Sequence, residues 1–321
     1  MNSILARARL ALMGVPERKI LGFKGGDTER WRHLEDALRA AVGGYHAVLE
    51  GGDVETVVAR LGRFPKHMNG YAHEGVAMGL TAYDLFLPNK SRLREFLAGA
   101  GDAHIYMSHI GVGEALAQLR RRPEPFLAKL EDPVARWLVM DGYGFHLGFF
   151  HPRRYVDRQQ VPPYLSPYGR RVFDQGVGRS IWFTEGADVD RVAAKVTAVA
   201  TVRQADFWLG IGTGCCYAGG MAPREIEYLR EVCGEHFAFL ATGAAFAAKG
   251  RHRAGNPVAD TEMACQILCE TDSFGARDVV EAALTDLPTN DRRNDCHVVQ
   301  DRVIATFTSE LAAPMGQEAS A

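Results

Sequence analysis

Apolar residues recur every three or four positions along most of the chain, which is the spacing of one face of an α-helix. Strong helix formers fill the same stretches. The clearest of these stretches read VETVVARL, RLREFLAG, GEALAQLRR, DRVAAKVTAV, REIEYLREV and AAFAAKGRHR. Alternating apolar and polar residues of the kind that predict strands are scarce. The pattern therefore predicts a mainly α protein.

Two predicted helix boundaries carry the same signals. The Glu-Gly pairs at 50–51 and 185–186 are typical of helix ends, because glycine readily takes the left-handed conformation that follows a helix. Asp53 and Asp188 follow these pairs at the same distance. A carboxylate at this position accepts a hydrogen bond from a free backbone N–H, so both are expected to be N-caps of the next helix.

Glycines interrupt the apolar helical stretches. They include Gly75, Gly79, Gly111, Gly113, Gly142, Gly144 and Gly148. Each lowers helix propensity by about 1 kcal/mol relative to alanine. Such glycines allow two helices to approach closely, or they leave room for a flat, narrow ligand. Close packing is the preferred interpretation for those that recur along the chain.

Two segments, 38–61 and 173–196, align without gaps at an offset of 135. The matches include Val42 with Val177, Gly43 with Gly178, Asp53 with Asp188, Gly75 with Gly210 and, after a contraction, His104 with His236 and Gly111 with Gly243. Self-similarity of this kind is the mark of a repeat architecture. We therefore expect internally duplicated helical repeats, packed as a glycine-rich bundle or a solenoid-like body.

The duplication divides the chain into four parts. Residues 1–155 form a first repeat unit that begins with an amphipathic N-terminal helix, and residues 173–285 form a second. Between them, residues 156–172 are rich in proline and polar groups, as a connector should be. Residues 286–321 are polar and are expected to be an irregular tail.

Composition narrows the classes of function. The hydrophobic fraction of 47% and charged fraction of 24% are those of a globular protein, and a net charge of −2 offers no basis for binding nucleic acid. No apolar run approaches the ~18 residues that span a bilayer. The six cysteines form no CxxC pair and are expected to be reduced, buried thiols in a cytoplasmic protein.

Candidate chemistry is concentrated in the first half of the chain. Residues that the fold requires should recur in both copies, whereas an active site is needed only once. His73 and Glu74 align with apolar residues at 208–209, and His109 aligns with Ala241. The candidate catalytic residues are His73, Glu74, His109, Asp141 and His146.

Three interpretations of this cluster stay open. One is a metal site of imidazole and carboxylate groups, with iron as the candidate metal. Histidines five apart point about 140° away from each other on a helix, and no Glu-x-x-His or HExxH pair is present. Another is metal-free acid–base chemistry by His109 or His146 with Asp141, Tyr143 or Glu114. In the third, the histidines only pack within a binding or scaffold protein.

Other motifs add little. The glycine-rich stretch at 210–220 lacks the spacing and the preceding strand of a dinucleotide-binding loop, so no cofactor is indicated. A group of arginines is compatible with a patch that faces a carboxylate or a phosphopantetheine group, and equally with surface charges. Its members are Arg153, Arg154, Arg170, Arg171 and Arg179.

Six motifs together resemble a known family. In order they are EGVAMGL, AHIYMSHIGVGEALAQL, WLVMDGYGFHLGFFHPRRYV, DQGVGRSIWF, YAGG and GAAFAAKGR. The set is similar to the UnbL-like family, a domain of unknown function encoded beside enediyne polyketide synthases, over about residues 20–270. None of the motifs is a catalytic signature, so the resemblance assigns no catalytic residue.

The resemblance implies a role in natural-product biosynthesis. The expected substrate is a polyketide-derived linear polyene, or another apolar small molecule, on the way to the alkyne-bearing enediyne core. The expected partners are proteins of the same gene cassette, including a membrane protein that would bring this cytoplasmic chain to the membrane. The alternative is a non-catalytic subunit that holds the substrate or serves as a scaffold.

Overall fold

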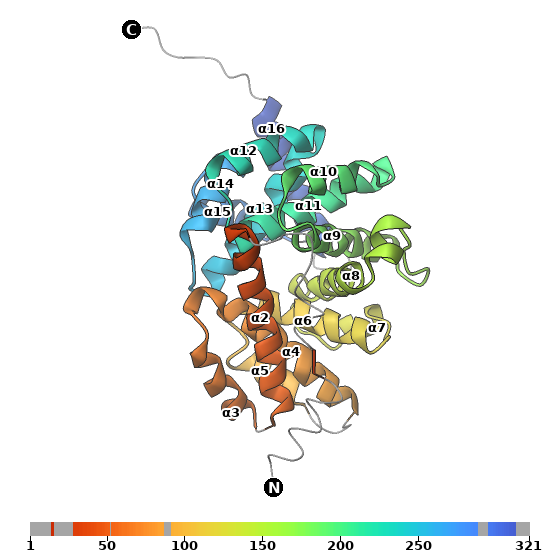
Figure 1. The fold of residues 1–321 in the computed structure, drawn as a ribbon, viewed down its shortest axis with the longest axis vertical. Helices are drawn as coiled ribbons and strands as arrows, with labels where there is room; N and C mark the ends of the chain where they lie inside the picture. The colour runs from red at the N-terminus through yellow and green to blue at the C-terminus, as the bar shows by residue number, and fades with distance from the viewer. Residues whose placement is uncertain (1–13, 16–27, 52, 87–90, 288–294, 313–321) are drawn as a thin grey trace.

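The computed structural model describes residues 14–15, 28–51, 53–86, 91–287 and 295–312, and it contains no strand in that part of the chain (Figure 1). The long helices are α2 (Glu29–Leu49), α4 (Asn69–Phe86), α6 (Ile105–Gln118), α8 (Leu138–Phe150), α9 (Pro167–Thr184), α11 (Thr201–Ala218) and α13 (Phe237–Arg253). The shorter ones are α3 (Val54–Ala59), α5 (Arg92–Ala98), α7 (Glu124–Leu127), α10 (Val189–Thr197), α12 (Pro223–Cys233), α14 (Ala259–Leu268) and α15 (Ser273–Ala283). The 18-residue helix α16 (Asp295–Ala312) ends the described part of the chain. The prediction of a mainly α protein is confirmed.

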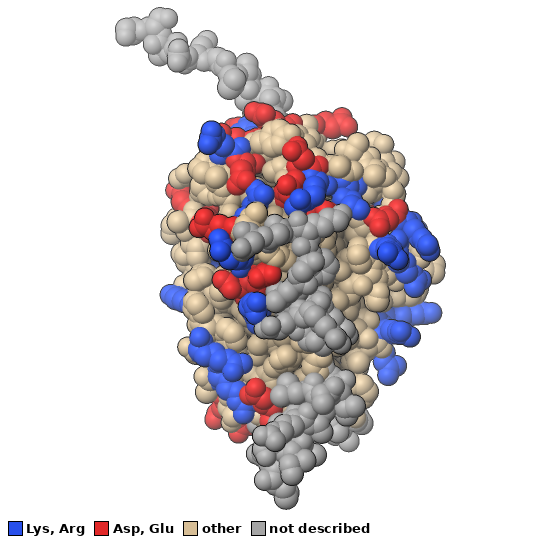
Figure 2. All heavy atoms as spheres, viewed as in Figure 1, with Lys and Arg blue, Asp and Glu red and all other residues tan. Residues whose placement is uncertain are grey.

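The long helices form one continuous array in chain order. Each packs along its length on the next: α2 on α4, α4 on α6, α6 on α8, α8 on α9, α9 on α11 and α11 on α13 (Figure 1). Charged residues of both signs are spread over the visible face (Figure 2). None of the described helices is both long and apolar enough to cross a membrane.

Consecutive long helices cross in close contact at glycine residues. A Cβ atom on Gly142 of α8 would lie 2.0 Å from the carbonyl oxygen of Ile110 in α6, and one on Gly176 of α9 would lie 1.9 Å from that of Asp141 in α8. Equivalent contacts of 1.8 to 2.0 Å occur at Gly75, Gly111, Gly210 and Gly243. Only a residue without a side chain allows backbones to approach this closely. Close helix packing, the preferred interpretation of these glycines, is confirmed.

The two ends of the array meet. The buried guanidinium of Arg251 in α13 donates hydrogen bonds to the carbonyl oxygens of His67, just before α4, at 2.6 Å and of Tyr217 in α11 at 2.5 Å. On α2, His33 Nε2 lies 2.6 Å from the carbonyl oxygen of Ala218. Because α2 and α4 thus contact α11 and α13, the array curves around an interior.

The predicted helix boundaries are also confirmed. Glu50 and Glu185 are C-caps, and the glycines after them have φ of 88° and 65°. Asp53 accepts a hydrogen bond from the Thr56 N–H at 2.8 Å, and Asp188 accepts one from the Arg191 N–H at 3.0 Å. Local sequence therefore places these helix ends correctly.

The C-terminal prediction is wrong for residues 295–312. The segment predicted as an irregular tail, 286–321, contains α16. Cys296, Val299, Val303 and Phe307 are buried, and their spacing of three or four makes an apolar stripe that the polar composition masked. Residues 313–321 lie outside the described part of the chain.

The structure does not test the predicted division of the chain into two repeat units. Helices α8 and α9, which the duplication assigns to different units, pack directly on each other, and α9 begins at Pro167 inside the predicted connector. Gly178 of α9 contacts the backbone of the next long helix. In α2 the corresponding contact is made by Gly44, although the glycine that aligns with Gly178 is Gly43. The duplication stays a prediction, and the predicted N-terminal amphipathic helix falls almost wholly on residues that the structure does not describe.

All six cysteines are free and buried, as predicted. The Sγ atoms of Cys216 and Cys265 lie 3.8 Å apart. Ellman's reagent is therefore expected to react with almost no thiol in the folded protein and with six in denaturant. Rapid labelling of several thiols without denaturant would contradict this arrangement.

Candidate functional site

In the six long helices from α2 to α11, the interior of the array is lined from the same two positions. One is the residue just before the crossing position, and the other is four residues later, on the same face of the helix. The pairs that line interior cavities are Ala41 and Tyr45, Glu74 and Met78, Ile110 and Glu114, Asp141 and Phe145, Gln175 and Arg179, and Leu209 and Thr213. The glycine crossings thus decide which side chains face inward.

Two mainly apolar cavities fill this interior. The first lies among α2, α4, α6, α8 and α9 and has a volume of about 50 Å³. The second extends to α11, α13 and α16 and has a volume of about 80 Å³. Tyr71, Arg179 and Phe183 line both cavities and divide them. A long, narrow ligand could therefore reach both cavities only by passing these three side chains.

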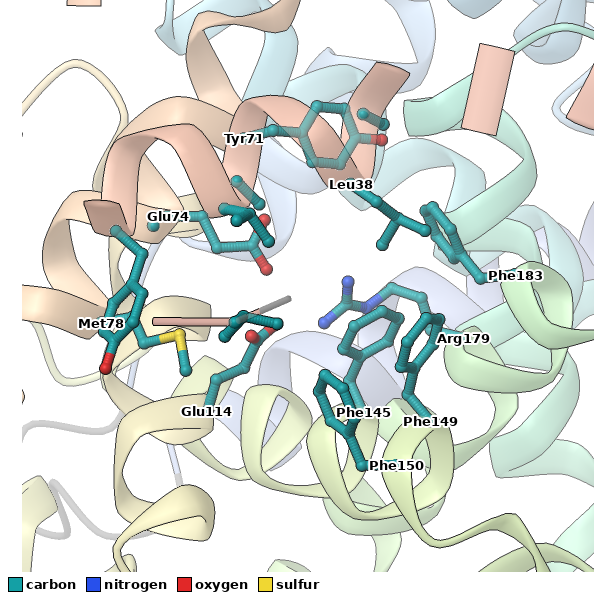
Figure 3. A pocket seen from close by; sticks show the side chains of 16 residues that line it. Leu38, Tyr71, Glu74, Met78, Glu114, Phe145, Phe149, Phe150, Arg179 and Phe183 are labelled. Atoms are coloured by element: carbon teal, nitrogen blue, oxygen red, sulfur yellow. The ribbon is translucent and has the colours of Figure 1, made fainter. Parts of the chain in front are cut away.

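Four ionisable side chains meet where the cavities join, and Figure 3 shows three of them, Glu74, Glu114 and Arg179. Glu74, Glu114, Asp141 and Arg179 are 3%, 9%, 5% and 4% exposed. Arg179 donates two hydrogen bonds to Oδ1 of Asp141, from Nε at 2.9 Å and from Nη2 at 2.6 Å. The remaining end of its guanidinium points between the two glutamates (Figure 3).

Burial sets the protonation of the two glutamates. It raises the pKa of Glu114 well above the usual value, and the neighbouring Glu74 raises it further. Burial also raises the pKa of Glu74, while Arg179 and a hydrogen bond with Glu114 oppose that rise. The two carboxyl groups are therefore joined by a hydrogen bond, and the pair holds its protons to a higher pH than free glutamates would.

Asp141 is paired with a cation, whereas the two glutamates lie beside each other. Burial raises its pKa, and the guanidinium of Arg179 opposes that rise through charge and hydrogen bonding. Removing either partner would leave a buried charge unpaired, which is costly in an apolar interior. Asp141 therefore holds the Arg179 guanidinium in place beside the two glutamates.

Aromatic rings surround the charged group. The ring of Phe145 lies under the Arg179 guanidinium, 4.2 Å from its carbon to the ring centroid. Phe149, Phe150 and Phe183 complete the wall beside it (Figure 3). Ring faces attract cations, so this wall can stabilise positive charge that develops on a ligand beside the carboxyl groups.

A second group of polar side chains joins α9 to α11 and α16. Gln175 donates to Oδ1 of Asp206 at 3.1 Å and exchanges hydrogen bonds with Gln300 of α16 at 3.0 and 3.3 Å. Arg171 lies 3.3 Å from Asp206. These contacts hold α9, and with it Arg179, against α11 and α16.

The structure brings together two of the five predicted catalytic residues. Glu74 and Asp141 belong to the charged group, whereas the three histidines line neither interior cavity. The ring of His73 stacks on that of His104 with centroids 4.0 Å apart, and His73 Nδ1 lies 2.7 Å from the carbonyl oxygen of Asn69. Adjacent residues point to different sides of a helix, so His73 faces away from the cavity that Glu74 lines.

The other two histidines are buried in separate places. His109 Nδ1 lies 2.7 Å from the carbonyl oxygen of Ile105, and its Nε2 is buried without a hydrogen-bond partner. His146 lines a groove on the outer side of α8, and burial lowers its pKa to about 3. Their catalytic assignment stays a prediction.

The sequence-based site lacked Arg179 as a catalytic candidate and weighed Glu114 only as a candidate metal ligand or as a partner for a histidine. The position of each residue identifies it. Glu114 lies four residues after the inward-facing Ile110, and Arg179 lies four residues after the inward-facing Gln175. Over the described ranges, no three or more His, Cys, Asp and Glu side chains group in a way that would hold a metal ion.

A family model described as a protein of unknown function (DUF1702) matches residues 7–307. The chain belongs to the DUF1702 family. Neither the search of curated proteins nor that of solved structures finds a match to this DUF1702 chain. The family description contains nothing on enediyne biosynthesis, which stays a proposal.

The stability of this DUF1702 protein should depend on the proton of Glu114. The pKa of Glu114 is raised in the fold, so above its ordinary value of 4.5 the unfolded chain releases a proton that the folded chain retains. The free energy of unfolding is therefore expected to fall as the pH rises from about 4.5 towards the raised pKa, by up to about 1.4 kcal/mol per pH unit.

Glutamine has the shape of a protonated glutamate and does not ionise. Glu114→Gln should therefore lose part of this pH dependence and unfold at a higher urea concentration than the wild type at pH 8. Urea titrations at pH 5 and pH 8 measure the difference. Identical pH dependence of the two proteins would contradict the protonated state of Glu114.

Proposed function

We propose that this protein is an enzyme that transfers protons to and from an unsaturated, apolar small molecule inside the helical array. The observation that supports the proposal most directly is the pair Glu74 and Glu114. One of the two groups holds a proton and the other is ready to accept one, within an apolar cavity. Such pairs of carboxyl groups with separated pKa values are suited to acid–base catalysis.

The proposed reaction moves a double bond. Glu114 gives its proton to one carbon of a double bond, whose π electrons form the new C–H bond and leave a delocalised cation. Glu74 then removes a proton from a carbon elsewhere in the conjugated chain, and those electrons form the new double bond. No electrons are lost, and the two carboxyl groups exchange roles.

The surroundings of the pair fit these steps. Arg179 favours the ionised form of both glutamates, and the charge of Glu74 in turn raises the pKa of Glu114, so we assign Glu74 as the acceptor at the start of the cycle. The rings of Phe145, Phe149 and Phe150 face the same space and would stabilise the cation. The apolar walls exclude water, which would otherwise capture the cation.

The proposed substrate class is a linear polyene of polyketide origin, as the resemblance to the UnbL-like family implies. The two cavities adjoin at Tyr71, Arg179 and Phe183, so an extended chain would run through both where these side chains move aside. In the second candidate function the chain only holds such a polyene for partner proteins. The predominantly apolar lining of both cavities favours binding in either case, and the carboxyl pair favours catalysis.

Deuterium transfer distinguishes the two functions. The apolar compounds that accumulate in cells lacking the gene would be incubated with purified protein in D2O. Proton transfer predicts a product with deuterium bound to carbon, detected by mass spectrometry. Conversion without deuterium would exclude this chemistry, and binding without conversion would assign the protein to substrate holding.

A further inference from the structure

A groove on the outer side of α8 adjoins the first cavity. It runs along the end of α6, the second half of α8 and the π-helical turn Arg153–Asp157. Val15, Phe149 and Phe150 line both the groove and the first cavity. Phe149 and Phe150 are therefore the partition between a surface groove and the interior that holds Glu74 and Glu114.

The charged side chains that line this groove are basic. They are Arg120, Arg153 and Arg154, which lie beside the imidazoles of His146 and His151, and no Asp or Glu of the described residues lines the groove. Lys and Arg side chains gather at the right edge of Figure 2, where Figure 1 places α7 and the connection between α8 and α9. The chain as a whole has a net charge of −2, so this concentration of positive charge is local.

Several of these groups have unused hydrogen-bonding capacity. Within the described ranges, the side chains of Arg120 and Arg153 have no hydrogen bond or ion pair, whereas Arg154 donates to Gln160 at 2.7 Å. His146 is 7% exposed and its Nδ1 is buried without a partner. Arg120 also follows α6 in the left-handed conformation with φ of 54°, a position where glycine is usual.

We propose that the groove binds the anionic head of a linear, apolar-chain ligand whose tail passes Phe149 and Phe150 into the first cavity. A carboxylate or phosphate oxygen accepts hydrogen bonds from Arg120 and Arg153, and a planar guanidinium suits either anion. The tail then lies beside Glu74 and Glu114. The inference rests on the proposed function for its substrate and narrows that substrate to a chain with a charged end.

Two sources supply such a head: a free fatty carboxylate and a phosphate-bearing acyl thioester. The probe is cis-parinarate, a linear tetraene carboxylate whose fluorescence rises when it leaves water. Competitors are palmitate, palmitoyl-coenzyme A and the uncharged methyl palmitate. The full chain is titrated with parinarate, and each competitor then displaces it.

Saturable binding of parinarate is expected. Arg120→Gln and Arg153→Gln should each weaken it about tenfold, the loss of one charge-assisted hydrogen bond. Arg158→Gln is the matched control: Arg158 is exposed in the same connection but does not line the groove, so its variant should bind as the wild type does. Methyl palmitate should compete much more weakly than the charged compounds.

Stronger displacement by palmitate identifies a carboxylate head, and stronger displacement by palmitoyl-coenzyme A identifies a phosphate head. Absence of parinarate binding, wild-type affinity in both arginine variants, or equal competition by methyl palmitate would each overturn the proposal. Glu114→Gln should bind parinarate normally. If the groove proposal is wrong, the arginine variants bind parinarate as the wild type does. If the proton-transfer proposal is wrong, Glu114→Gln forms product as fast as the wild type.

Discussion

Replacing Glu114 by glutamine is expected to reduce product formation by a factor of about 10² to 10⁴, the usual contribution of a general acid. Glu114 holds a proton in the folded protein because it is buried beside Glu74. Glutamine can still donate a hydrogen bond to Glu74, but it has no proton to give to a carbon atom. The fold should therefore persist while the chemistry stops.

The measurement is product output from cells in which the deleted gene is replaced by the variant, with the amount of protein determined in parallel. Glu231→Gln, an exposed change of the same kind on α12, is the control and should restore wild-type output. His109→Gln tests the sequence-based candidate in the same assay. Full output from Glu114→Gln at a normal protein level would remove Glu114 from the proposed mechanism.

Replacing Gly176 by alanine is expected to destabilise the fold by about 3 kcal/mol, the upper part of the range for overpacked interiors. In an open helix the same change stabilises by about 1 kcal/mol. At Gly176, however, the new Cβ would lie 1.9 Å from the carbonyl oxygen of Asp141, and backbone atoms cannot move aside as a flexible side chain can. Helices α8 and α9 would have to separate.

Gly250→Ala is the matched control, because Gly250 is also helical and buried and a Cβ there would meet its nearest neighbour at 3.7 Å. Urea denaturation should show a lower midpoint for Gly176→Ala and an equal or higher one for Gly250→Ala. Equal midpoints for the two variants would contradict the close crossing of α8 and α9. Because Asp141 binds Arg179, the first variant should also disturb the charged group.

Local sequence was sufficient wherever the determining interactions are local. The N-caps Asp53 and Asp188 bond to backbone groups three residues away, so their signals are complete within a short window. The prediction failed for α16, because its helix depends on a sparse apolar stripe that is buried only against the rest of the array. Composition alone could not reveal that burial.

The candidate site was also predicted only in part from local sequence. The contrast between the two copies pointed to Glu74, yet it also selected His73, which lies on the other side of α4. Arg179 comes from a different helix than either Glu74 or Asp141, and nothing within a single helix indicates that α8 and α9 cross at Gly176. The partner of Asp141 follows only from that crossing.

The sequence by itself determined that the chain is helical, where several helices begin and end, and that its glycines are suited to close packing. These properties depend on backbone conformation and on neighbours within a few residues. Only the tertiary structure decided which faces point inward, that four charged residues from four helices meet between two cavities, and that a basic groove adjoins them. Inward direction is a property of helix pairs, because a face is buried only when another helix packs against its flank.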